Sequence, residues 1–236
     1  MVKGIMTFIL TSFLIGNVVA WFTGAAPIEF KEIAFNEQQS QQYAFLSNEL
    51  KSAPNDIDLL IELGQLLSNH NRIDEANTLL TQAVALAPNN PLANAIYASN
   101  RGKQAGAMFD PLMGLYKLGK LKAAMSDLND AALAAPNDFN VRLVRLLTFA
   151  FVGEIGGHYE TVFDDESWFT GIFSNDVSVP SQVKQLVYVA MAHVYRNADQ
   201  DKSIQYITLT NGIGPCPNTF EASCAQLGIQ SLAGNE

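Results

Sequence analysis

The sequence has few of the residues from which catalytic and metal sites are built. It holds three histidines and two cysteines in 236 residues, and His70, His158 and His193 are far apart in the chain. No zinc-binding spacing such as C-x2-C, H-x3-H or HExxH occurs, and neither a P-loop, a GxGxxG segment nor a GxSxG elbow is present. We therefore expect a protein that is not an enzyme and that needs no metal or cofactor.

The remaining candidates for chemistry have simpler interpretations. Asp164, Asp165 and Glu166 are adjacent acids, but side chains at consecutive helical positions point around the helix axis rather than toward one cation. We expect these three residues to form a solvated helix end. His70 is expected in a solvated turn between two helices, and His193 is expected to point outward from its helix.

Basic residues are also scarce. The chain has 14 Lys and Arg against 23 Asp and Glu, which gives a formal net charge of −9 and a pI near 4.7. Because binding to nucleic-acid phosphates needs a basic face, a nucleic-acid partner is not expected. No motif indicates a small-molecule substrate, whereas protein partners are compatible with this acidic surface.

The chain has no series of alternating apolar and polar residues, which is the pattern of half-buried strands. Hydrophobic residues make up 48% of the sequence, and the helix formers Ala and Leu are abundant. We expect an all-α protein whose main part is one elongated domain with a sizeable core.

Charge is missing altogether from Ile5 to Phe22, a run that follows Lys3. As a helix this run would be about 27 Å long, enough to cross the hydrocarbon core of a bilayer. An uncleaved anchor is the favoured interpretation, because the run is long for a signal peptide and Pro27 would block cleavage after Ala26. A cleaved signal sequence and a buried soluble helix stay as alternatives.

The charges that flank this run predict its orientation. Lys3 precedes it, and Glu29 and Glu32 follow it, which favours a cytoplasmic N-terminus. The rest of the chain would then lie in the periplasm, held to the inner membrane by one transmembrane helix. A cleaved form would be a free periplasmic protein.

A repeat of 34 residues organises the next part of the chain. Pro54 and Pro88 lie one repeat apart, and each is followed by Asn, in APND at 53–56 and APNN at 87–90. Apolar and small residues occupy the positions that pack a pair of helices, namely Leu60, Leu63, Gly64, Leu67, Ala76, Leu80, Ala83 and Pro88. This pattern resembles the tetratricopeptide repeat (TPR), with Leu60, Leu67 and Leu80 in place of its aromatic residues. The resemblance implies a TPR-like α-solenoid of antiparallel helix pairs behind an N-terminal transmembrane helix.

The repeat pattern weakens after this pair. APND returns at 135–138, and counting back from Pro136 predicts a second repeat over 105–138, with extra residues inserted at 101–106. Its expected core residues are Leu112, Leu115, Ala124, Leu128 and Ala131. A last pair begins near Pro180 and has Ile204 at the position of the small residue.

Two further helices are expected to close the ends of the array, over 30–53 and over 219–232. The chain therefore divides into an anchor or signal sequence at 1–26, a linker and capping helix at 27–53, and a TPR-like repeat domain at 54–236.

Cys216 and Cys224 flank a Pro-Asn turn before the last expected helix. Export would place them in an oxidising compartment, where a disulfide could fasten the terminal helix to the array. The loop-entropy model gives such a bond about 2 to 3 kcal/mol of stabilisation. Two free, buried cysteines are an equally supported alternative.

The TPR resemblance also implies a binding surface, because the first helix of each pair lines a concave groove in that family. The residues at the groove positions of the matched repeat are Asp58, Ile61, Glu62, Gln65, Ser68 and Asn69. They are mostly polar and lack the basic clamp of carboxylate-binding TPRs, which suits hydrogen bonding to an extended or helical peptide. The expected function is a non-enzymatic interaction scaffold whose partners are other proteins or peptide segments.

A narrower resemblance provides an alternative function. The N-terminal anchor, an acidic half-repeat that ends before Pro54-Asn-Asp, and an opening Leu59-Leu-x-x-Leu-Gly are similar to the exported TPR segment of bacterial cytochrome c biogenesis factors. The likeness covers residues 44–98. It implies a role in holding apocytochrome for haem attachment.

Overall fold

The computed structural model describes residues 2–175 and 178–229, and every regular element within these ranges is a helix. The α-helices are α1 (Val2–Ala20), α2 (Glu37–Ser52), α3 (Ile57–Asn69), α4 (Ile73–Leu86), α5 (Pro91–Ala107), α6 (Leu115–Ala134), α7 (Phe139–Val152), α8 (Thr161–Asn175), α9 (Ser181–Tyr195), α10 (Gln200–Ile213) and α11 (Glu221–Leu227). The predicted all-α class is confirmed for this part of the chain.

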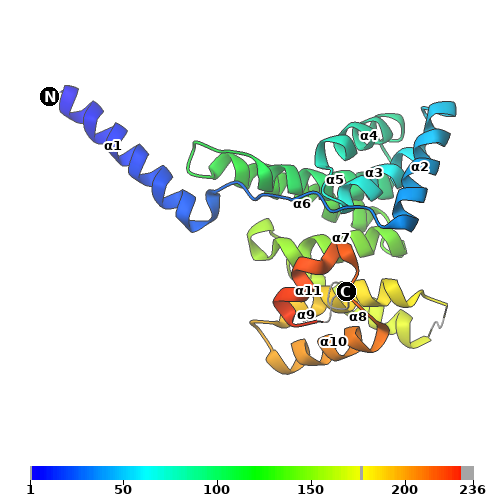
Figure 1. Ribbon diagram of the computed structural model, residues 1–236. Coiled ribbons are helices and arrows are strands. Elements are labelled where there is room, and N and C mark those ends of the chain that lie inside the picture. Colours follow the sequence, from blue (N-terminus) through cyan, green and yellow to red (C-terminus); the bar gives the residue numbers. More distant parts are fainter. Residues whose placement is uncertain (1, 176–177, 230–236) are drawn as a thin grey trace.

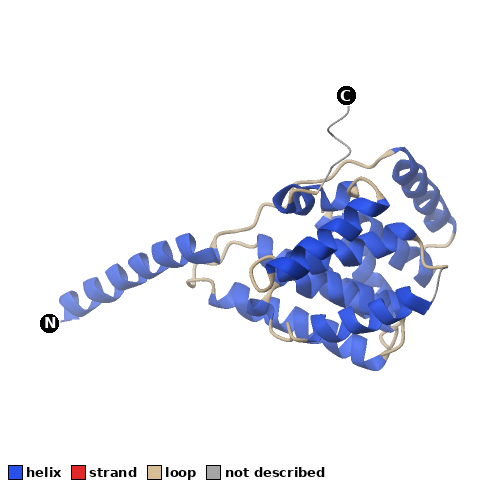
Figure 2. Cartoon of the chain, turned by 90° about the horizontal axis from the view of Figure 1, so that it is seen from below, coloured by secondary structure: helices blue, strands red, loops and turns tan. Residues whose placement is uncertain are grey.

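Consecutive helices pack against each other through the body of the molecule. α2 lies on α3, α3 on α4, α4 on α5 and α5 on α6, whereas α7 contacts both α5 and α9, and α9 packs on α10. α1 projects away from this body, and the chain returns from it past α6 and α5 toward α2 (Figure 1). The view turned by 90° shows one packed group of helices from which α1 stands out (Figure 2).

Three turns of related sequence have nearly the same geometry. Each joins the end of one helix to the start of the next through the residues Ala53, Asp56 and Leu59; Ala87, Asn90 and Ala93; or Ala135, Asp138 and Val141. The Ala residues have φ of −131°, −134° and −135°. In each turn the Ala carbonyl accepts the backbone N–H of the Asp or Asn at 3.0 or 3.1 Å. The side chain of that Asp or Asn accepts the backbone N–H of Leu59, Ala93 or Val141. The Asp or Asn thus caps α3, α5 or α7.

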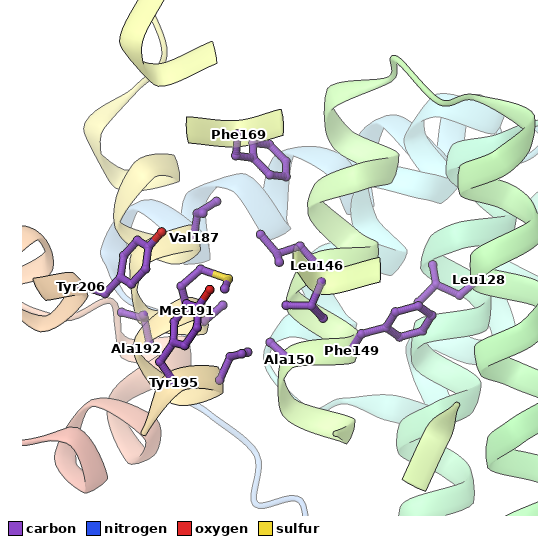
Figure 3. Close-up of a cluster of buried hydrophobic side chains, with 14 of the residues drawn as sticks. Leu128, Leu146, Phe149, Ala150, Phe169, Val187, Met191, Ala192, Tyr195 and Tyr206 are labelled. Atoms are coloured by element: carbon purple, nitrogen blue, oxygen red, sulfur yellow. The ribbon is translucent and has the colours of Figure 1, made fainter. Parts of the chain in front are cut away.

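The core consists of two groups of buried apolar side chains. One joins α2, α3, α4 and α5, and the other extends from α5 to α11. Figure 3 shows the second group, in which Leu146 of α7 faces Val187 and Met191 of α9. All the residues at the packing positions of the predicted repeat, except Pro88, are buried in the region of the first group. A Cβ on Gly64 would lie 2.7 Å from Leu80 Cδ2, so glycine permits this close crossing of α3 and α4.

α1 and the turn Trp21–Ala25 form a stretch that is long and apolar enough to cross a membrane. The span covers Lys3–Ala25, and none of it is buried inside the protein. A helix of this length and composition is compatible with an anchor and with a signal sequence.

The helix that was expected over 30–53 begins only at Glu37, because Asn36 caps it there through Gln39. The preceding residues are extended and bond to the ends of other helices. The Ile28 N–H donates to the Gly106 carbonyl (2.9 Å), and the Ile33 N–H donates to the His70 carbonyl (3.1 Å). These carbonyls lie at helix ends and lack helical partners, which favours an extended segment over another helical turn.

The predicted insertion at 101–106 accounts for only part of the extra length. α5 continues as a helix through these residues and is longer than α3, and the rest of the extra length lies in the turn at 108–114 and in a longer α6. Leu112 and Leu115 are exposed, by 52% and 66%, and do not belong to the core. α6, the second helix of this predicted repeat, follows the prediction, because Ala124, Leu128 and Ala131 are buried.

Two predictions about the last helices also need correction. Ser203, not Ile204, takes the small-residue position: Ser203 is buried and donates its hydroxyl to the Ala192 carbonyl, whereas Ile204 is 53% exposed. The capping helix expected over 219–232 is the short α11 at Glu221–Leu227, and the end of that prediction lies outside the described residues.

Cys216 and Cys224 form a disulfide that closes the turn before α11. Within this turn, Asn218 donates to the Ala34 carbonyl (3.2 Å) and to Gln39 Oε1 (3.1 Å). The two ends of the helical body therefore meet at this point, although these residues are far apart in sequence.

We predict opposite effects for two glycine substitutions. Gly64→Ala would push a Cβ against the fully buried Leu80 and lower the free energy of unfolding by about 1 to 3 kcal/mol. Gly119→Ala, in the exposed face of α6 with nothing within 4 Å, would raise it by about 0.5 to 1 kcal/mol. Urea unfolding of the full chain in detergent measures both values. Equal effects would contradict the close α3–α4 crossing.

Candidate functional site

The predicted groove residues lie on α3 and differ in accessibility. Asp58, Glu62 and Asn69 are exposed and Gln65 is half-buried. Ile61 and Ser68 are 5% exposed and pack inside the protein, so their side chains are not available to a partner. The surface that α3 presents is therefore narrower and more polar than the six positions imply.

Neighbouring helices supply further polar groups to this surface. Gln42 of α2 donates to Glu62 Oε1 (3.0 Å), which extends the polar face onto α2. At the other end of α3, Lys103 of α5 donates its ammonium to the Ser68 carbonyl (2.5 Å) and to Asn71 Oδ1 (3.1 Å). Burial lowers the pKa of Lys103 to about 8. We define the polar face as Gln42, Asp58, Glu62, Gln65 and Asn69.

The polar face does not continue along the array. Counted from the capping residues, the groove positions of α5 include the buried Ala95 and Ile96, and those of α7 include Leu143, Val144 and Leu147. Ser99 of α5, which corresponds to Gln65, is bonded to Thr148 of α7 between their hydroxyl oxygens (2.8 Å). Asn140 of α7, which corresponds to Asp58, is an exposed polar residue at these positions, and the other accessible polar groups described above lie on α2 and α3.

The acidic triplet on α8 is not the solvated helix end that was expected. Asp165 is fully buried, and its carboxylate accepts from Arg142 Nε (2.7 Å) and from Arg145 Nε and Nη2 (2.8 and 2.7 Å). Glu166 accepts from the hydroxyls of Tyr195 (2.7 Å) and Tyr206 (2.5 Å). The triplet thus links α8 to α7, α9 and α10 and has a structural role.

The interaction of Tyr206 with Glu166 also affects ionisation. Burial, with the neighbouring carboxylate of Glu166 as a further cause, raises the pKa of the Tyr206 hydroxyl. The phenol therefore stays protonated and donates to Glu166 throughout the physiological pH range.

Two histidines are also placed differently from the expectation. His70 is 1% exposed; its Nδ1 is 2.8 Å from the Leu66 carbonyl, and its ring lies 4.5 Å from that of Phe35. His193 is half-buried against the Phe151 ring, at 4.8 Å. Sequence reasoning missed both because the covering residues come from distant parts of the chain.

A cavity of about 840 Å³ lies beside His193 and is lined by α7, α8 and α9 and the segment between α7 and α8. Its aromatic lining includes Phe151, His158, Tyr159 and Phe163. Burial raises the pKa of Tyr159 and lowers that of His193, so both groups favour their neutral forms. Two carboxylates, Glu154 and Glu160, also line the cavity, so the lining suits an aromatic or a cationic side chain. Among the described residues, no group of three or more His, Cys, Asp or Glu is placed to hold a metal.

Comparisons of the chain with family models, with curated proteins and with solved structures find no match.

Sequence reasoning identified α3 as the helix with accessible groove positions but missed the contribution of α2. Gln42 belongs to a Gln-rich stretch at 37–42, which reads as a solvated helix face when taken alone. Leu46, four residues after Gln42 and on the same face of α2, is buried in the core beside α3, which explains why Gln42 lies next to Glu62.

Removing the buried carboxylate of Asp165 is predicted to be severely destabilising. Asp165→Asn would leave the guanidinium groups of Arg142 and Arg145 without an anion and cost about 3 to 5 kcal/mol. Asp164→Asn, at the exposed neighbouring position, is the matched control and should change stability by less than about 0.5 kcal/mol. Thermal or urea unfolding in detergent compares them, and similar small effects for both would exclude the buried ion pairs.

The histidines predict a loss of stability in mild acid. Burial lowers the folded-state pKa of His70 and of His193 below the value of 6.5 that applies to an exposed histidine. Below that value the unfolded chain binds more protons than the folded protein, so the free energy of unfolding falls as the pH falls. Urea titrations at about pH 7.5 and about pH 5.5 should show a smaller loss in the double variant His70→Gln, His193→Gln than in the wild type. An equal loss in both proteins would refute the assignment.

Proposed function

We propose that the protein is a non-enzymatic scaffold that binds protein partners through a TPR-like array of helix pairs. The observation that carries this proposal is the threefold recurrence of the Ala-Pro-Asn turn with a matching cap on α3, α5 and α7. A recurring turn gives each pair the same entry angle, and regular stacking of pairs creates an extended binding surface.

We further propose that α1 is an uncleaved anchor and that the array lies on the extracytoplasmic side of the membrane. Two features support this location. No part of the apolar span Lys3–Ala25 is buried inside the protein, and Cys216 and Cys224 form a disulfide. Disulfides persist in the periplasm and outside the cell but are rare in the cytosol.

The polar face on α2 and α3 is the proposed contact surface. Its exposed carboxylates, Asp58 and Glu62, lie beside the amide groups of Gln42 and Gln65. Amides donate and accept hydrogen bonds, and carboxylates accept them. A peptide segment with free backbone groups and at least one Lys or Arg would complement this combination.

A capture experiment with full-length protein from solubilised membranes tests this function. We expect the wild type to capture a reproducible set of envelope proteins. Glu62→Lys should lose them, because it reverses the charge at the centre of the polar face. Asp130→Lys, on the exposed side of α6, reverses one charge elsewhere and should retain them.

Mass spectrometry of the captured proteins separates the outcomes. Cytochrome c maturation proteins in the wild-type set would favour the role in holding apocytochrome. Loss of the partners in both variants, or in neither, would contradict the proposed contact surface, and an empty wild-type capture would contradict the scaffold function.

A further inference from the structure

The turn between α5 and α6 exposes an unusual amount of apolar surface. Within residues 109–116 five large side chains are exposed: Phe109 (65%), Leu112 (52%), Met113 (41%), Leu115 (66%) and Tyr116 (52%). Burying apolar surface is worth about 25 cal/mol per Å², so such a dense group is costly to leave in water. Contiguous exposed apolar groups mark sites of contact with a protein or a membrane. We name residues 108–116 the apolar turn.

The apolar turn lies against the end of α1 (Figure 1). The Met113 N–H donates to Asn17 Oδ1 (2.9 Å), and the Phe109 and Trp21 rings are 6.1 Å apart. A Cβ on Gly16 would lie 2.6 Å from Met113 Sδ, so the Met113 side chain packs on α1 at a position where glycine provides no side chain.

Polar bonds hold the turn in this position. The Asp110 carboxylate accepts the N–H groups of Leu112 and Lys117, both at 2.8 Å. The Lys117 ammonium donates to the Ala26 carbonyl (2.7 Å), directly after the apolar span. The turn is therefore fastened to the segment that leaves α1.

The contact with Asn17 fixes the depth of the turn in a bilayer. Asn17 lies inside the apolar span: it precedes Ala20, the last residue of α1, by three residues, and Ala25, the last residue of the span, by eight. A bilayer that surrounds the span to Ala25 must therefore also surround the tip of the turn. The bond between Asn17 and the Met113 N–H pairs two polar groups that would otherwise be unsatisfied at this depth.

The residues around the tip match the composition of a membrane interface. Trp and Tyr concentrate at this level, and Lys side chains extend from it toward lipid phosphates. Trp21 is beside the turn, and Tyr116 lies under the ammonium of Lys120, at 5.3 Å. Lys120 and Lys122 are exposed on the following turns of α6.

We propose that the apolar turn inserts into the bilayer leaflet nearest the helical body and forms a second membrane contact beside α1. The inference rests on the proposed anchoring of α1 in a membrane. Its consequence is orientation: one helix alone leaves the body free to swivel, whereas two contacts hold the polar face at a set angle to the membrane.

Fluorescence quenching in nanodiscs tests the insertion with full-length protein. Lipids with a nitroxide high on the acyl chain quench only tryptophans near that depth. The first protein, Trp168→Phe, keeps Trp21 as its single tryptophan and reports on α1. The second combines Trp21→Phe, Trp168→Phe and Phe109→Trp. The matched control combines Trp21→Phe, Trp168→Phe and Leu133→Trp. Leu133 is exposed and lies about 27 Å along α6 from Leu115.

We expect the Phe109→Trp protein to be quenched by the same fraction as the protein with Trp21, and the Leu133→Trp control to keep its fluorescence. Quenching of Trp21 without quenching at position 109 would overturn the second contact and leave the anchor intact. Quenching of neither would overturn the anchor and the second contact together. Circular dichroism checks that all the variants are folded.

Discussion

The structure depends on one constraint, which is that a pair of helices cannot bury its own apolar face. Each pair here covers the next: α5 packs on the α3–α4 pair, α7 joins α5 to α9, and α2 and α11 lie at the ends. Close packing requires small residues where helices cross, which explains Gly64 opposite Leu80 in one pair and Ser203 against Ala192 in another. The Ala-Pro-Asn turns then set where each new helix begins.

Stacking leaves the ends of the helical body open, and this chain closes them with its own segments. Extended residues between α1 and α2 bond to the ends of α3 and α5, and the turn closed by the disulfide reaches back to Ala34 and Gln39. The same stacking places apolar residues at the groove positions of α5 and α7. As a result, accessible polar groups concentrate on α2 and α3, and the proposed function depends on that area.

The sequence predicted the parts of the fold that depend on local periodicity. Leu60, Leu67 and Leu80 are buried as the repeat register requires, because their spacing matches helices that face one core. Contacts between distant segments were not predictable in this way. The burial of Asp165 depends on Arg145 of another helix, and the burial of His70 depends on Phe35, which lies in a segment that looked helical. For the site, the same register placed the polar groups of α3 but could not show that Ile61 and Ser68 are covered.

Mass spectrometry of tryptic peptides from the native membrane fraction, alkylated without reduction, tests the account of a membrane-held, extracytoplasmic array most directly. The account predicts a peptide that runs from Gly4 to Lys31, which is the cleavage product of an intact α1. It also predicts an unalkylated C-terminal peptide in which Cys216 is bonded to Cys224. A mature start near Ala26 would contradict the anchor, and alkylation of both cysteines would contradict the oxidising compartment.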